Sequence, residues 1–400
     1  MKKLFALLLA FSCLFLTACN QKPADSTTGT GNPQNQVQPN ETELKDTIIF
    51  QSHQYFFDLP SRVLFHQNGK NYYYSKADGQ AYVYCFDPLC EHTDGYCLAD
   101  PDNMEFGTLD LNTAFFINNR FYITTLNGII VSFSFDGMDK KIEYDAGYDV
   151  NANAWSYNPV AYGKYIYISL RADEKGNPHT LRFNTETGEM EDLTEKTGNY
   201  IEPSFFYNGE IYGYSAGPER LKSDLDLNYC EETTKNRFSP HILGSCFFDT
   251  AFDDNWNGIG IQIYDMKTGE TKIITNETIG VNKKIDIVCV DENYIYFYQV
   301  GDIYIGDFLY KDEVRKYNKG NDGSIYRINH DGSGLICIYE EDEFEITSSE
   351  AVISGNQFLI KGQNILVRDL QVETWNSGVL VGTIGADGKI DELKPVEVVE

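Results

Sequence analysis

A two-strand unit recurs along this chain and constrains its fold more than any other feature. Each copy has a short apolar run, a turn with Gly or Asn, and a second run in which tyrosine alternates with apolar residues. Such a turn between two apolar runs predicts a β-hairpin, because tight hairpin turns need positive φ angles. The turn residues of the six copies are Gly69, Asn119, Gly163, Gly209, Asn293 and Gly355.

A second predicted hairpin follows most copies. The clearest examples are Phe133–Gly137, Leu181–Glu189, Ile263–Glu270 and Ile325–Gly334. Two hairpins per unit make a four-stranded antiparallel sheet, and a repeat of about 40–50 residues is typical of propeller blades. The turns are 50, 44, 46, 84 and 62 residues apart. No long helical pattern alternates with the strands, so the sequence predicts an all-β fold, a β-propeller of four-stranded blades.

The 84-residue spacing between Gly209 and Asn293 does not fit this repeat. It holds either an insertion near residues 215–258 or a further blade. We expect six blades with an insertion, and seven blades is the alternative. Long loops on propellers often carry the binding function, so the insertion and the central funnel are the predicted binding regions.

The N-terminus predicts export. Lys2 and Lys3 precede an apolar run that ends at Leu16, which is typical of a signal peptide. This run is shorter than a membrane-spanning helix, which needs about 20 apolar residues. The following Leu-Thr-Ala-Cys stretch, ending at Cys19, resembles the bacterial lipobox. That resemblance implies cleavage after residue 18, lipidation of Cys19 and a membrane anchor outside the cytoplasm.

Three segments are therefore expected. Residues 1–18 are the predicted lipoprotein signal peptide. Residues 19–46 are rich in Asn, Gln, Thr, Pro and Gly, so they are predicted to be a lipidated, disordered linker. Residues 47–400 are the predicted propeller domain.

The composition disfavours nucleic acid as a partner. The chain carries 32 Lys and Arg against 60 Asp and Glu, a formal net charge of −28. A surface this acidic repels phosphate backbones and anionic lipid headgroups. Contact with the membrane is therefore expected through the lipid alone.

The repeat resembles exported bacterial propellers of the TolB-like type, and most closely the propeller lipoproteins of Gram-positive gut anaerobes. Ile325–Gly334, with the sequence Ile-Tyr-Arg-Ile-Asn-His-Asp-Gly-Ser-Gly, is similar to their blade-end signature. The resemblance extends over most of residues 55–395. It implies fold and location, and no particular activity.

Three cysteines and a histidine lie close together in the sequence. Cys85, Cys90, His92 and Cys97 have the spacing C-x4-C-x-H-x4-C. Three thiolates and one imidazole complete the tetrahedral ligand set of a structural zinc ion, and a filled shell leaves no open position for catalysis. A disulfide within the group is the alternative, since exported chains meet oxidising conditions, and free thiols are a third.

Two further cysteines, Cys230 and Cys246, fall in the expected insertion and could form a disulfide. No catalytic residue is predicted. Gly213–Gly217 matches the Gly-x-Ser-x-Gly pattern, but that motif works as a strand-to-helix turn on an α/β sheet, and Pro218 follows here.

The leading hypothesis is therefore a membrane-anchored, extracytoplasmic propeller that binds or scaffolds a glycan, a peptide or an envelope protein without catalysis. One alternative is an extracellular polysaccharide hydrolase or lyase. Another is an accessory or sensor subunit of an envelope complex. An exposed apolar patch would favour docking onto a protein.

Overall fold

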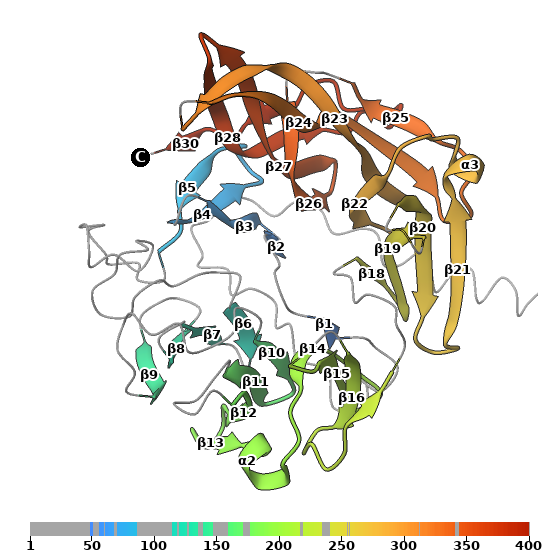
Figure 1. Ribbon diagram of the computed structural model, residues 1–400. Helices are drawn as coiled ribbons and strands as arrows, with labels where there is room; N and C mark the ends of the chain where they lie inside the picture. The colour runs from blue at the N-terminus through green and yellow to red at the C-terminus, as the bar shows by residue number, and fades with distance from the viewer. Residues whose placement is uncertain are drawn as a thin grey trace, which may run out of the picture. The chain divides into compact units, whose positions relative to one another are not determined.

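The computed structural model describes residues 49–50, 56–59, 61–67, 70–85, 114–117, 120–125, 128–134, 139–146, 159–170, 177–216, 219–233, 241–253, 255, 257–311, 313–340 and 344–399. These residues are almost entirely β-strands, and two short helices, α2 (Leu193–Thr197) and α3 (Asn276–Ile279), interrupt them. The chain is a β-propeller of four-stranded antiparallel sheets, as predicted (Figure 1). No helix among the described residues has the length and apolar character needed to cross a membrane.

Seven sheets are found in the described ranges, numbered here in chain order. Sheet 1 holds β2 (Phe56–Leu59), β3 (Arg62–Gln67), β4 (Lys70–Ser75) and β5 (Ala81–Val83); sheet 2 holds β6 (Ala114–Ile117), β7 (Arg120–Thr124), β8 (Ile129–Ser134) and β9 (Lys140–Asp145); sheet 3 holds β10 (Val160–Tyr162), β11 (Tyr165–Leu170), β12 (His179–Asn184) and β13 (Met190–Asp192).

The remaining four sheets follow the same order of strands. Sheet 4 holds β14 (Glu202–Tyr207), β15 (Glu210–Tyr214), β16 (Arg220–Asp224) and β17 (Glu231–Glu232); sheet 5 holds β18 (Ile242–Leu243), β19 (Cys246–Phe252), β20 (Gly258–Asp265) and β21 (Glu270–Thr275); sheet 6 holds β22 (Ile285–Val290), β23 (Tyr294–Tyr310), β24 (Glu313–Asn329) and β25 (Ile336–Tyr339); sheet 7 holds β26 (Phe344–Ser354), β27 (Gln357–Arg368), β28 (Gln371–Thr383) and β29 (Lys394–Pro395).

The count of seven sheets corresponds to the alternative prediction rather than to six blades with an insertion. Residues near 215–258 contribute strands β16 to β19 instead of one long irregular loop. The additional turn is at Gly244, which has positive φ between β18 and β19. The sequence marks this hairpin only weakly, as Ile-Leu-Gly-Ser-Cys-Phe-Phe over residues 242–248, because β18 has only two residues.

Apolar clusters fill the spaces between neighbouring sheets. Buried side chains from sheets 2 and 3, 3 and 4, 4 and 5, 5 and 6, and 6 and 7 form five such clusters. A sixth joins the first and last sheets, where Phe65 and Tyr74 pack with Leu359 and Val381. Burial of aromatic and branched side chains therefore joins the successive blades from sheet 2 to sheet 7, and sheet 7 to sheet 1.

Both ends of the domain add a strand to a sheet that is distant in sequence. β30 (Val398–Val399) pairs in parallel with β5, the last strand of sheet 1. β1 (Ile49–Phe50) pairs with β14, the first strand of sheet 4. The C-terminal strand thus reinforces the closure between sheets 1 and 7.

Candidate functional site

Most of the predicted metal site lies outside the described residues. Cys90, His92 and Cys97 are not described, and neither is Cys19, the predicted lipidation site. Cys85 follows β5 and is partly buried. Within the described ranges no group of three or more His, Cys, Asp or Glu side chains is arranged to hold a metal ion. Zinc binding by this cluster stays a prediction.

The predicted disulfide between Cys230 and Cys246 is not present, because both are free thiols. They belong to different sheets. Cys230 lies beside β17, and its thiol contacts the Tyr200 carbonyl at 3.8 Å, whereas Cys246 begins β19 and pairs with Leu243. Burial raises the pKa of each thiol, which keeps both protonated near neutral pH.

Ser215 is not placed as a hydrolase nucleophile. It lies between β15 and β16, two antiparallel strands, and its hydroxyl donates a hydrogen bond to the Glu219 carboxylate. The strand-to-helix turn that the nucleophile motif requires is therefore missing at this position.

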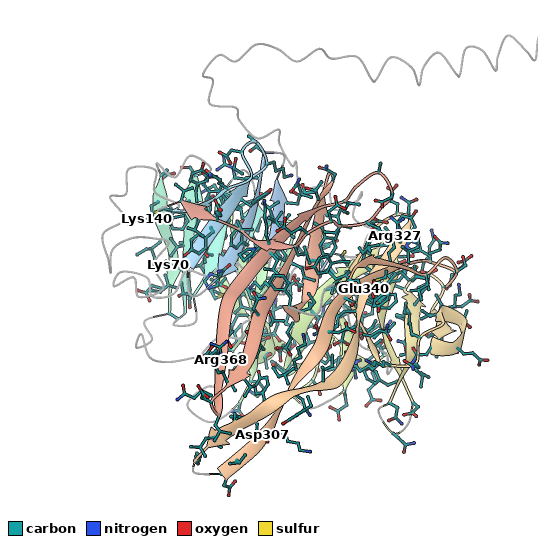
Figure 2. All side chains as sticks on the ribbon, turned by 90° about the horizontal axis from the view of Figure 1, so that it is seen from above. Lys70, Lys140, Asp307, Arg327, Glu340 and Arg368 are labelled. Carbon is teal, nitrogen blue, oxygen red and sulfur yellow. The ribbon has the colours of Figure 1, made fainter. Side chains whose placement is uncertain are left out.

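The candidate site is an arm built by two long hairpins, β23–β24 and β27–β28. β23 and β24 have 17 residues each, whereas the corresponding strands of sheet 3, β11 and β12, have six. The inner halves belong to the propeller core, and the outer halves extend beyond it. Figure 2 shows the two hairpins projecting together, with Asp307 and Arg368 on them.

A reciprocal pair of hydrogen bonds fixes the base of the arm. The buried Asn321 side chain on β24 donates to the Ile346 carbonyl and accepts from the Ile346 amide, both at 2.9 Å. Glu345 accepts from the Gly320 amide at 2.6 Å and from the Gln363 side chain at 3.0 Å. These bonds tie β24 to β26 and β27 where the hairpins leave the core.

The outer end of the arm is also braced. The Leu309 amide donates to the Leu370 carbonyl at 2.8 Å, which links the ends of the two hairpins. Gly306, at φ 157°, lies so close to Val367 that a Cβ there would come within 2.7 Å of it. The absence of a side chain at this position therefore allows the two hairpins to pack. The two hairpins are therefore joined to each other at the outer end of the arm as well as at its base.

Exposed apolar side chains are frequent on the outer half of this arm. Ten large apolar side chains are exposed in the described part of the chain, and five of them are here; we call these five the arm tip surface: Tyr304, Leu309, Tyr310, Val314 and Leu370. Leu309 and Val314 face each other across the two strands and are 51% and 61% exposed. Clustering of this kind marks interaction surfaces more often than isolated exposed residues do.

Cations accompany the tyrosines of the tip. Arg315 lies over the Tyr310 ring at 4.6 Å, and Lys311 lies 5.2 Å from the same ring. Lys316 lies 5.8 Å from the Tyr304 ring. Desolvation and the neighbouring Asp307 carboxylate raise the pKa of Tyr304, so its hydroxyl is protonated at neutral pH. The tip thus combines apolar, aromatic and cationic groups on a chain that is otherwise strongly acidic.

A polar pocket of about 390 Å³ lies where the first and last sheets meet. Asp78, Asp391 and Lys394 line it, together with the buried Tyr74, whose hydroxyl donates to Gln357 at 3.0 Å. Hydrogen bonds from neighbouring groups lower the pKa of Asp78, so this carboxyl is ionised near neutral pH. The pocket lies near the β26–β27 turn, at the opposite end of the strands from the β27–β28 turn that belongs to the arm.

The sequence pattern does not reveal the arm. The pattern predicts two separate hairpins, one containing the start of β23 and the other the end of β24. It makes no prediction for residues 298–324. One signal is present, namely the 62-residue spacing between the Asn293 and Gly355 turns, which exceeds that of an ordinary blade. Bulges in the β23–β24 register break the alternation of side chains and hide the continuous strands.

Comparison with known proteins gives only distant likenesses. No protein-family model matches the chain, and none of the curated proteins matches it in sequence. Among solved structures, it is similar to an oligogalacturonate lyase of Vibrio parahaemolyticus, with 12% identity and a TM-score of 0.45 over 87% of this chain and 96% of that one.

Two further solved structures are similar to the chain to a lower degree. PorZ, a surface component of the type-IX secretion system of Porphyromonas gingivalis, has 10% identity and a TM-score of 0.37 over 88% of this chain and 52% of its own. YjhT has 10% identity and a TM-score of 0.34 over 70% of this chain and 96% of its own.

Proposed function

We propose that this chain is a membrane-anchored extracytoplasmic lipoprotein whose propeller docks onto an envelope protein through the arm tip surface, without catalysis. One observation carries the proposal: half of the exposed large apolar side chains in the described residues lie on this one projecting arm. Leaving them in water is unfavourable, at roughly 25 cal/mol per Å² of apolar surface, and contact with a partner would recover that free energy.

The construction of the arm supports docking onto a folded partner. Hydrogen bonds fix it at the base and at the tip, so little conformational entropy is lost when it binds. Tyrosine and arginine are also the residues that contribute most often to protein interfaces, and Tyr310 and Arg315 lie in contact here.

The charge of the tip also suits docking onto a protein. Lys311, Arg315 and Lys316 offset the acidic residues of the same hairpin, whereas the whole chain has a net charge of −28. The tip can therefore approach another acidic envelope protein with less repulsion than the rest of the surface would meet. The lipid predicted on Cys19 would hold the domain near such partners, in the manner of an accessory subunit of an envelope complex.

The test is site-specific photo-crosslinking in intact cells, with the photoreactive residue placed at Tyr304 of the full-length protein. We expect a discrete protein adduct that becomes at least about tenfold weaker in the double variant Leu309→Asp, Val314→Asp, since tenfold corresponds to about 1.4 kcal/mol, a modest loss for two contact residues. Both side chains are exposed, so the stability of the propeller should hardly change.

Ile273→Asp is the matched control, because Ile273 is similarly exposed but lies on β21 of sheet 5. It should leave the adduct unchanged. An adduct that is equally strong in the arm variant and in the control would contradict docking through the arm, and so would the absence of any adduct at Tyr304.

A further inference from the structure

The polar pocket between sheets 1 and 7 has the size of a small-molecule site. Its volume of about 390 Å³ falls within the range of roughly 300–1,000 Å³ that is usual for such sites. Sheet 1 contributes Tyr74, Asp78 and Gly79 to its wall, and sheet 7 with the segment after β28 contributes Gln357, Val381, Gly382, Thr383, Asp391, Glu392 and Lys394. A ligand that fills the pocket therefore contacts both the first and the last sheet.

Two carboxylates of the pocket lie on a segment that the core holds in place. Asp391 and Glu392 are exposed, whereas the residues on either side of them, Ile390 and Leu393, are 5% and 2% exposed. Gly382 allows this segment to lie against β28, because a Cβ there would come within 2.8 Å of the Glu392 carbonyl oxygen. The two carboxylates therefore start from fixed backbone positions, which lowers the entropy cost of binding a ligand.

A third carboxylate, that of Asp78, is held by its own turn in sheet 1. It accepts from the Gln80 amide at 3.2 Å and from the Tyr82 hydroxyl at 2.9 Å. Burial and the nearby Asp78 raise the pKa of Tyr74, so the Tyr74 hydroxyl stays protonated near neutral pH. Sheet 1 thus supplies an ionised carboxylate and a hydroxyl group to the wall of the pocket.

The charges of the wall favour a cation. Asp78, Asp391 and Glu392 provide three carboxylates against the single ammonium group of Lys394. The side chains of Asp391, Glu392 and Lys394 form no hydrogen bond or ion pair within the part of the chain that the structure describes, so their charged groups are available to a ligand. The net charge of −28 on the whole chain also attracts cations and repels anions.

The arrangement of these groups fits an organic cation better than a metal ion. In the described ranges no three Asp, Glu, His or Cys side chains are placed to hold a metal ion, so the carboxylates of the pocket do not converge on one point. A cation that extends over several bonds can reach more than one of them. The hydroxyls of Tyr74 and Thr383 and the amide of Gln357 also line the pocket, and these groups both donate hydrogen bonds to hydroxyl groups and accept them.

We infer that this pocket binds a small ammonium compound that also carries hydroxyl groups, of the amino-sugar kind. Asp391 and Glu392 pair with the ammonium group, and Gln357 and Thr383 hydrogen-bond to the hydroxyl groups. The pocket lies near the β26–β27 turn, at the opposite end of the strands from the arm. Binding here is therefore independent of the docking proposed above.

The test is a saturation-transfer NMR titration of the full-length protein with glucosamine as the probe. We expect saturable binding with half-saturation on the order of 1 mM, as for a ligand of about a dozen non-hydrogen atoms. The double variant Asp391→Asn, Glu392→Gln should bind at least about tenfold more weakly, because hydrogen bonds to charged groups contribute most. Both residues are exposed, so the variant should fold normally.

The matched control is Glu270→Gln, Glu277→Gln, which removes two exposed charges from β21 and α3. It should bind glucosamine as the native protein does, since charges outside the pocket are screened by salt. Glucosamine that does not bind saturably, or that binds the pocket variant and the control equally well, would overturn the proposal.

Two further probes identify the group that is recognised. Glucose has a similar ring without the ammonium group, and N-acetyl-lysinamide has an ammonium group without ring hydroxyls. We expect both to bind at least about tenfold more weakly than glucosamine, because each loses one set of contacts. Equal binding of glucose would overturn recognition of the ammonium group. Equal or tighter binding of N-acetyl-lysinamide would assign the pocket to a peptide and overturn the amino-sugar class.

Discussion

The hairpins β11–β12 and β23–β24 begin alike and end very differently. Both start with Tyr-Ile-Tyr, at Tyr165–Tyr167 and at Tyr294–Tyr296, and both place an arginine opposite the second tyrosine. Up to this point the two hairpins use the same register and the same cation–aromatic stacking. Beyond it, β11 ends at Leu170, whereas β23 continues to Tyr310.

The surroundings of the two arginines differ, although the starting sequences are nearly the same. In sheet 3, Arg182 pairs with carboxylates from its own outer strand and from the segment after β16 of the next sheet. Around Arg327, Ile336 of sheet 6 lies on the outer strand, and Gly388, which follows β28 of sheet 7, packs against the guanidinium. The long hairpin of sheet 6 is stabilised by a second long hairpin from sheet 7. The same Tyr-Ile-Tyr segment with its facing arginine thus occurs in two hairpins. One is short and its arginine forms ion pairs, whereas the other is long and its arginine stacks on tyrosine.

The largest expected difference between the two hairpins is in the free energy of unfolding after loss of each arginine. Arg182→Met should cost about 2–3 kcal/mol, because it removes the partner of two carboxylates and leaves a half-buried network unsatisfied. Arg327→Met should cost less than about 1 kcal/mol, since no ion pair is lost and the stacking surface is largely kept.

Urea unfolding of the purified protein, followed by tryptophan fluorescence, measures both values. Arg315→Met, on the exposed arm tip, is the control for removing one positive charge from an acidic chain. Equal costs at Arg182 and Arg327 would show that the acceptors around Arg182 contribute nothing, and the comparison would fail.

The repetitive part of the fold could be predicted from the sequence, because each hairpin turn is encoded locally. Gly163 and Gly209 adopt positive φ, as their turns require. The alternation of tyrosine with apolar residues marks the strands beside them. The all-β class and the four-stranded sheets follow from these signals alone.

The number of sheets and the candidate site could not be predicted, because both depend on long-range pairing. β18 is established by its pairing with β19, since two residues before a glycine carry only a weak pattern. The arm depends on contacts between sheets 6 and 7, such as that of Asn321 with Ile346, which are separated in sequence and have no local signature. Exposed apolar residues within a strand look the same in a sequence as buried ones.

The next largest effect should come from the base of the arm. Asn321→Leu removes both hydrogen bonds to the Ile346 backbone and leaves a buried amide and carbonyl without partners, at a cost of about 2 kcal/mol. The loss should be local, because the inner halves of the strands are held by the core between sheets 6 and 7.

Hydrogen exchange measured by mass spectrometry should therefore show faster exchange for peptides covering 303–319, with little change for 165–184. Asn318→Leu is the matched control, since Asn318 lies on the same strand but is exposed. If both variants left the exchange of the arm unchanged, the arm would be held by its tip alone and not by Asn321.

The smallest expected effect is on how the free energy of unfolding depends on pH. It concerns Glu191, the carboxylate that pairs with Arg182 in sheet 3. Hydrogen bonds from Lys196 and Arg182 hold the pKa of Glu191 below its ordinary value of 4.5. A carboxyl whose pKa is lowered by folding stabilises the native state above its unfolded pKa, and that contribution is lost as the pH falls through the folded pKa. Glu191→Gln should therefore reduce the free energy of unfolding at pH 7 by roughly a few tenths of a kcal/mol, because the pair is partly exposed.

The pH profile below 4.5 provides the sharper test, since the Glu191→Gln variant should lose stability with acid less steeply than the native protein. In the Arg182→Met background, Glu191→Gln should change the free energy of unfolding by less, because only Lys196 then remains to pair with the carboxylate. Ile336, which faces Arg327 in sheet 6, does not titrate, so it contributes no pH dependence to the free energy of unfolding. Urea unfolding at several pH values measures all four proteins. Parallel profiles for the native protein and the Glu191→Gln variant would mean that the carboxylates around Arg182 do not account for the difference between the two hairpins.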